Sequence, residues 1–104
     1  MANFLLIYHG GSMPEGEAEQ AKVMGAWTAW FGTLGDKLVD GGNPVSQTRT
    51  IASNGSVSDG SSNPSTGYSV IKADNLDQAV SLAKGCPVLA GGASVEVAET
   101  FAVM

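Results

Sequence analysis

The sequence has few of the residues that most often supply chemistry in small proteins. Its 104 residues include one cysteine and one histidine, and 14% of them are charged. Because Cys86 is alone, an internal disulfide and a cysteine-rich zinc site are excluded, which indicates a reducing compartment. A metal centre needs about three or four histidine, cysteine or clustered carboxylate ligands, so we expect no metal site. We expect no cofactor either.

The charge balance argues against two classes of partner. Ten acidic residues against five basic ones give a net charge of -5, the wrong sign for binding nucleic acid or an anionic membrane. The start of the chain, MANFLLIY, lacks the basic segment and cleavage site of a signal peptide. Its apolar run is also far shorter than the roughly 20 residues that span a bilayer. These features predict a cytoplasmic protein.

The length indicates a single domain over residues 1–104. Hydrophobic residues make up 43% of the chain, and the charged fraction is well below the quarter that is usual in soluble proteins. We therefore expect some apolar surface to meet a partner.

Two helices are predicted from the spacing of apolar residues. Residues 15–34 carry Val23, Trp27, Trp30 and Leu34 at helical spacing, and Gly35 is placed to end this helix. A shorter helix opens at Asp74 or Asn75, whose side chains can cap it, and ends before residues 85–87 (GCP).

The strands are predicted from apolar runs and turn residues. Residues 4–8 (FLLIY) are continuously apolar and are expected to be buried on both faces of a sheet. Asn54-Gly55 separates two short runs and is the strongest short-range hairpin signal. Further strands are predicted at residues 37–40, 67–73 and 95–98, with loops at residues 10–14, 41–44 and 59–66.

This order of elements predicts an α+β fold. Strand, long helix, strand, hairpin, strand, short helix and strand match a ferredoxin-like protomer, β-α-β-β-α-β, with an added hairpin. Helices cover only one sheet face in that fold. Since the chain has few charges, we expect a second copy to cover the other face in a homodimer.

Three stretches carry a family resemblance: FLLIYHGG, VSDGSSNPSTGYSVI, and DNLDQAVSLAKGCP followed by GGASVEV. Together with the tryptophan-bearing helix they span almost the whole chain, which resembles the YCII-related or DGPF-domain family. The resemblance implies a dimeric α+β barrel built from ferredoxin-like protomers. Most members have no established activity. A few relatives act as lyases on small ring-cleavage products, with a His and an Asp as the suspected acid-base pair.

The chain departs from the family pattern at two places. Asp59-Gly60 matches the first half of the Asp-Gly-Pro-Phe signature, but Ser61-Ser62 stands where Pro-Phe would be. The polar loop is therefore expected to line the site in place of a hydrophobic wall. In the enzymatic relatives the histidine is expected on the first helix, whereas here His9 ends the first strand.

The candidate catalytic residues are His9, Asp59 and Asp40. His9 precedes Gly10-Gly11 and can exchange a proton near neutrality; the alternative is a histidine that only ends a strand. Each aspartate ends a predicted strand and precedes a glycine, so either one could orient the imidazole. The alternative for both is an ordinary Asp-Gly turn.

Four further residues are candidates for binding a small ligand. Ser61, Asn63 and Ser65 offer hydroxyl and amide groups from one loop, and Arg49, the only arginine, would suit a carboxylate. All four would be equally ordinary as solvated residues. The tryptophans of the long helix are interpreted as packing residues.

Three functions fit these features. The first is a homodimer with a pocket in each protomer, in which His9 and an aspartate perform cofactor-free acid-base chemistry of the lyase or isomerase type on a small metabolite. The second is a non-catalytic dimer that binds a small ligand or docks a partner protein. The third is a dimeric-barrel oxygenase or haem-degrading protein, which the missing helix histidine and the shortage of aromatic pocket residues oppose.

Overall fold

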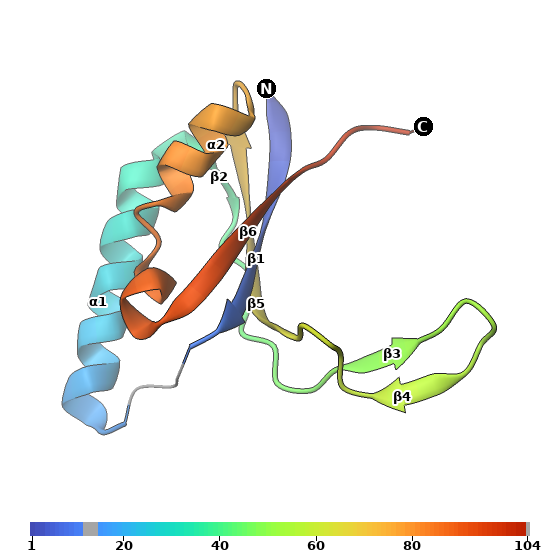
Figure 1. The fold of residues 1–104 in the computed structure, drawn as a ribbon. Helices are drawn as coiled ribbons and strands as arrows, with labels where there is room; N and C mark the ends of the chain where they lie inside the picture. Colours follow the sequence, from blue (N-terminus) through green and yellow to red (C-terminus); the bar gives the residue numbers. More distant parts are fainter. Residues whose placement is uncertain (12–14, 104) are drawn as a thin grey trace.

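The computed structural model describes residues 1–11 and 15–103. It has an α+β fold in which two helices lie on one face of an antiparallel four-stranded sheet (Figure 1). Residues 12–14, the second part of the expected loop at residues 10–14, lie outside the described residues. In chain order the elements are β1 (Ala2–Gly10), α1 (Glu17–Leu34), η1 (Gly35–Lys37), β2 (Leu38–Asp40), β3 (Arg49–Ile51), β4 (Val57–Asp59), β5 (Ser65–Ala73), α2 (Leu76–Ala83), η2 (Pro87–Gly91) and β6 (Ala93–Glu99).

The sheet has the strand order β2-β5-β1-β6, and every neighbouring pair is antiparallel. Helix α1 therefore connects the parallel strands β1 and β2, which have β5 between them. Helix α2 connects the parallel strands β5 and β6, which have β1 between them. This arrangement is compatible with a ferredoxin-like protomer. The predicted α+β class is confirmed.

The central strand β1 is buried on one face only, which corrects the expectation of burial on both. Phe4, Leu6 and Tyr8 are buried, whereas Leu5 and Ile7 are half-buried. Successive side chains of a strand point to opposite faces, and the helices cover only one of those faces (Figure 1). A continuous apolar run does not by itself show that both faces are covered within the chain.

Helix α1 packs through its second half. Trp30 and Leu34 are buried, and Trp30 Nε1 donates a hydrogen bond to the Leu82 carbonyl at 3.2 Å. Gly35 has a φ of 54° directly after the helix, which glycine adopts without steric cost. The predicted end of the helix is confirmed, and its start lies two residues later than expected.

Of the two predicted capping residues of the second helix, Asn75 is the one that caps α2. The Asn75 side chain accepts a hydrogen bond from the Gln78 amide at 2.8 Å. Ala79 and Ala83 pack into the core beneath β1 and β5. A 3-10 helix after α2, η2, was not anticipated from the sequence.

The hairpin predicted around Asn54-Gly55 is confirmed. Its strands β3 and β4 pair with each other alone, as a separate two-stranded sheet. The hairpin projects from the body on the side of the sheet away from the helices (Figure 1). Strand β5 begins at Ser65, so the loop after the hairpin is shorter than expected.

Neither described helix is long and apolar enough to cross a membrane.

Candidate functional site

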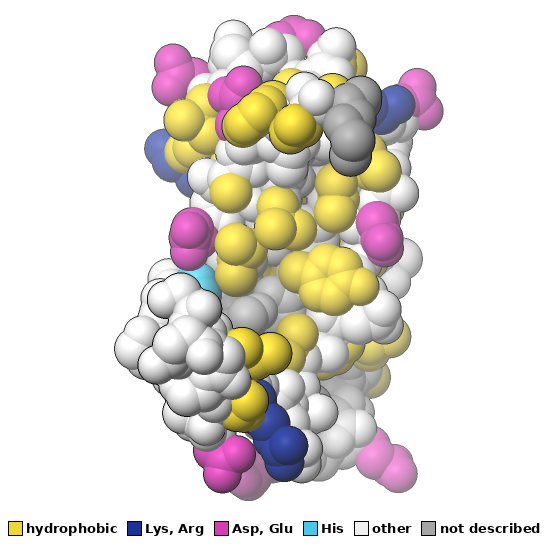
Figure 2. Space-filling model, turned by 90° about the vertical axis from the view of Figure 1, so that its right-hand side faces the viewer, with side chains coloured by type: hydrophobic (Ala, Val, Ile, Leu, Met, Phe, Trp, Pro, Cys, Tyr) yellow, Lys and Arg dark blue, Asp and Glu magenta, His cyan; other side chains and the backbone are white. Residues whose placement is uncertain are grey.

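The face of the sheet turned away from the helices carries the candidate site. We call this surface the open face. Strand register places Leu5 beside Val70 and Ala98, and Ile7 beside Tyr68 and Glu96. The apolar side chains among these residues are half-buried. Figure 2 shows hydrophobic side chains running along this surface, with the cyan imidazole of the single histidine at its edge.

His9 is held on the open face by two acceptors. Its Nε2 lies 3.1 Å from Glu96 Oε1, and its Nδ1 lies 3.2 Å from the Pro64 carbonyl oxygen. The hydrogen bond to Glu96 raises the pKa of His9 above its usual value, and the Pro64 carbonyl raises it further. Because both partners accept, the imidazolium satisfies both of them, whereas neutral imidazole can donate to only one.

Strand pairing brings Glu96 and His9 together. His9 lies opposite Ser94 on β6, so Glu96 is its diagonal neighbour on the same face. On the other side, a register shift between Tyr8 and His9 places His9 opposite Ser65. A β-bulge of this kind changes how nearby side chains are aimed. The loop before β5 thereby reaches the imidazole.

Glu96 was not among the partners predicted for His9, which were Asp40 and Asp59. The alternation of Val95, Glu96 and Val97 does predict that Glu96 lies on the opposite face from the two valines. It does not reveal the register between β6 and β1. This register brings together two residues, His9 and Glu96, that are almost 90 positions apart in the chain.

Asp40 does not share a hydrogen bond with His9 in this structure. It lies at the end of β2, and the sheet places β5 between β2 and β1. Its Oδ1 accepts a hydrogen bond from the Gly42 amide at 2.8 Å. In the single chain Asp40 therefore shapes the turn that follows β2.

Asp59 is on the projecting hairpin. Its Oδ1 lies 3.4 Å from Arg49 Nε, and the two side chains are 95% and 75% exposed. Such an exposed pair contributes little to stability. The structure thus brings two predicted site residues, Arg49 and Asp59, to each other rather than to His9.

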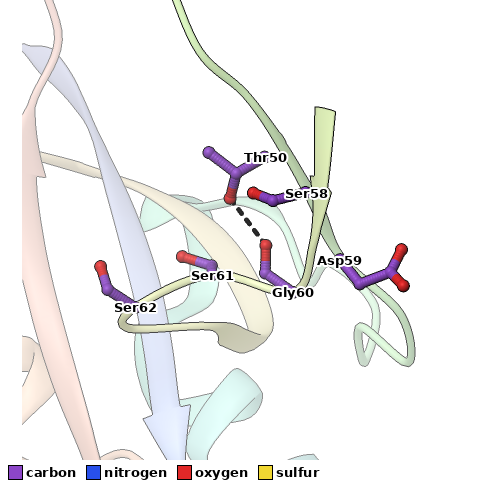
Figure 3. Close-up of a pocket in the computed structure, with 6 residues that line it drawn as sticks. All are labelled: Thr50, Ser58, Asp59, Gly60, Ser61 and Ser62. Atoms are coloured by element: carbon purple, nitrogen blue, oxygen red, sulfur yellow. Dashed lines mark hydrogen bonds between the residues drawn. The ribbon is translucent and has the colours of Figure 1, made fainter. Parts of the chain in front are cut away.

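The loop after the hairpin forms an open polar hollow of about 350 Å³. Thr50 donates a hydrogen bond to the Gly60 carbonyl at 2.6 Å across it. Figure 3 shows the Asp59 carboxylate pointing away from the hydroxyls of Ser61 and Ser62. The lining residues are Thr50, Ser58, Asp59, Gly60, Ser61 and Ser62.

Of the candidate ligand-binding residues in this loop, Ser61 lines the hollow and Asn63 lies near His9. The Ser61 hydroxyl lines the hollow and accepts a hydrogen bond from the Asn63 amide at 3.3 Å. Asn63 and Pro64 contribute backbone to the surroundings of His9, and both raise its pKa. Ser65 bonds to the backbone of Gly67. The loop therefore approaches the imidazole with main-chain carbonyls rather than hydroxyls.

A buried polar chain lies on the opposite face of the same strands. Tyr8 donates a hydrogen bond to Ser69 Oγ at 2.7 Å, and Ser69 donates to the Gly41 carbonyl at 2.8 Å. Burial raises the pKa of the Tyr8 hydroxyl and of the Cys86 thiol. Both groups therefore stay protonated at neutral pH, and Cys86 is buried in the hydrophobic core.

In the described ranges there is no group of three or more His, Cys, Asp or Glu residues arranged to hold a metal ion. No protein-family model matches the chain, and no curated protein matches it at a significant level. The resemblance to the YCII-related family accordingly rests on the sequence stretches that carry it.

Proposed function

We propose that the chain forms a homodimer through its open face and that His9, paired with Glu96, transfers a proton to a small metabolite. One observation carries the chemistry: the imidazole lies between a carboxylate and a backbone carbonyl, both of which favour its charged form. No cofactor is part of this proposal.

The apolar character of the open face supports the dimer. An antiparallel sheet that meets water on one face normally carries polar residues there. Here Leu5, Ile7, Tyr68 and Val70 line the centre of that face and remain half-buried. Contiguous exposed apolar surface marks an interaction site in soluble proteins. A second copy with the same face could cover it, as in a dimeric α+β barrel.

The geometry favours a proton donor over a general base. The His9 side chain is 14% exposed, whereas Glu96 is 59% exposed. A carboxylate or carbonyl oxygen of a ligand could replace Glu96 at Nε2 while Pro64 keeps hold of Nδ1. In an elimination or isomerisation of a small carboxylated or aromatic-derived metabolite, the displaced Glu96 carboxylate would take a proton from the ligand's carbon while His9 delivers its own proton to the ligand's carbonyl oxygen or leaving group, so that one proton leaves the ligand and one enters it.

A second candidate function follows from the same two hydrogen bonds. Because both ring nitrogens of His9 already have protein partners, the pair also serves as a fixed link between β1, β6 and the loop before β5. In that case the protein is a non-catalytic dimer that binds a small ligand or docks a partner protein.

An NMR titration of the single histidine tests the His9–Glu96 pairing. Glu96→Gln should lower the pKa of His9, because it removes the largest cause of the upward shift. Asp59→Asn and Asp40→Asn are matched controls and should leave this pKa unchanged. If His9 titrates like a free imidazole in the wild type, the proton-transfer proposal loses its basis.

A screen of small carboxylated and carbonyl-containing metabolites then separates the two functions. Turnover by the wild type that His9→Gln abolishes, while Asp59→Asn retains it, supports acid-base chemistry. Saturable binding without turnover, unaffected by His9→Gln, supports the binding dimer instead.

A further inference from the structure

We infer that the hairpin β3–β4 contacts the second copy of the chain in the dimer, with Ile51 and Val57 as its contact residues. We call this hairpin the clasp. This inference rests on the proposed homodimer and adds to it a part of the molecule that the open face does not include. It assigns a role to the segment that projects farthest from the body.

Among residues 1–11 and 15–103 the hairpin has no packing partner in the hydrophobic core. All six residues of its strands are exposed, and none of them belongs to the hydrophobic core or packs against it. An isolated two-stranded hairpin is at best marginally stable in water. A short hairpin that stands away from the body therefore gains most of its stability from something outside the chain.

One face of the hairpin has the composition of an interface. Ile51 pairs with Val57 across the strands, and these side chains are 72% and 61% exposed. Arg49 and Asp59, which pair two positions away, lie on the same face. An apolar centre bordered by charged groups is the usual anatomy of a protein interface.

The hairpin projects on the side where the open face lies. Figure 1 shows the hairpin and the chain after β6 both leaving the sheet on the side away from the helices. Figure 2 shows the apolar stripe of the open face with the hairpin beside its lower end. Phe101, beyond β6, is 82% exposed. The open face, the hairpin and the segment that carries Phe101 thus lie on the same side of the sheet.

The size of the open face indicates that it needs additional contacts. Strands β1 and β5 have nine residues each, β6 has seven and β2 has three. At about 3.3 Å per residue and 4.8 Å between strands, this sheet face projects on the order of 450 Å². A standard stable interface buries about 800 Å² per partner. The hairpin and the segment after β6 can supply the difference.

The shape of the chain agrees with a clasp. Its radius of gyration is 15.1 Å, whereas a compact domain of about 100 residues has roughly 13 Å. The shortest extent is 18 Å, about the thickness of one sheet and one layer of helices. The chain is therefore a flat two-layer body with an arm, and a second such body would complete the layers.

A second copy fits this surface better than an unrelated protein. In a twofold-symmetric dimer the same patch is used on both subunits, so one contact buries two open faces and two hairpins at once. The region from Thr50 to Ser58 carries no charge, so the clasp avoids repulsion between copies that each have a net charge of -5.

Sedimentation of the full chain at micromolar concentrations tests the clasp. Val57→Asp places a charge on the apolar face of the hairpin, and Ser58→Asp places the same charge on the opposite face of the same strand. We expect Val57→Asp to weaken dimerisation at least tenfold, about 1.4 kcal/mol, and Ser58→Asp to change it less than threefold. Both side chains are exposed in the single chain, so each variant should keep the cooperative thermal unfolding of the body.

The outcomes separate the clasp from the dimer. A wild type that dimerises as strongly as Val57→Asp refutes the clasp and leaves the dimer through the open face intact. Equal weakening by both variants also refutes the clasp, because a general charge effect would then explain it. A wild type that stays monomeric at tens of micromolar refutes both proposals.

Discussion

Replacing Ser69 with alanine should strongly destabilise the fold, although the change removes a single oxygen atom. Ser69 is fully buried at the centre of β5. Its hydroxyl accepts from Tyr8 and donates to the Gly41 carbonyl, which joins β1, β5 and the end of β2. Ser69→Ala leaves one buried donor and one acceptor without this partner.

The magnitude follows from the two groups that lose their partner. Each unsatisfied buried polar group costs about 1–3 kcal/mol, so two fully buried groups would cost roughly 2–6 kcal/mol. Because the hydrogen bond to the Gly41 carbonyl is only part-buried, Ser69→Ala should lower the free energy of unfolding by roughly 2–4 kcal/mol. In a domain of this size each 1 kcal/mol shifts Tm by about 4–8 °C. Tyr8→Phe should cost less, about 1 kcal/mol, because Ser69 can still donate to Gly41.

A double-mutant cycle in urea measures the coupling between Tyr8 and Ser69. In the Tyr8→Phe background no tyrosine hydroxyl remains to lose its partner, so Ser69→Ala should cost about 1 kcal/mol less than in the wild type. All variants must be compared at one protein concentration, since dimerisation adds to apparent stability. Ser81→Ala, on the exposed side of α2 and away from the open face, is the control and should not lower stability. A near-neutral Ser69→Ala, or strict additivity with Tyr8→Phe, would refute this account of the polar chain.

Three further changes have expected outcomes. Gly42→Ala should prevent or severely impair folding, seen as loss of a cooperative thermal transition, because φ is +76° and a Cβ would lie 1.6 Å from the Tyr68 carbonyl oxygen. Asn75→Ala removes the side-chain cap of α2 and should lower the free energy of unfolding by about 1 kcal/mol in urea. Glu96→Gln should reduce stability at acidic pH only. The pKa of His9 is higher in the folded protein than its value near 6.5 in the unfolded chain. The ion pair therefore stabilises the fold fully below about pH 6.5, and this contribution disappears as the pH rises through the pKa of the folded state. Unfolding curves for wild type and Glu96→Gln should therefore converge at high pH, and a constant difference between them would contradict the pairing.

The candidate site could be predicted from the sequence only in part. The position of His9 at the end of β1 was anticipated from its place before two glycines. Its hydrogen bond to the Pro64 carbonyl, in the loop before β5, came from the structure. Its carboxylate partner was not, because Asp40 and Asp59 were chosen for their local Asp-Gly context. The structure gives these two aspartates local roles, in a turn and in an ion pair on the hairpin.

The sequence by itself determined the local elements of this protein. Apolar spacing, a helix cap at Asp74 or Asn75, Gly35 as a helix end and Asn54-Gly55 as a hairpin turn act over a few residues. The structure has the cap at Asn75, and the others appear where they were expected. Only the tertiary structure decided which side chains meet. Glu96 reaches His9 through a register between strands far apart in the chain, and the face that carries them is left uncovered because both helices pack on the other one. Long-range register and the choice of covered face depend on the packing of the whole chain, and no short segment encodes them.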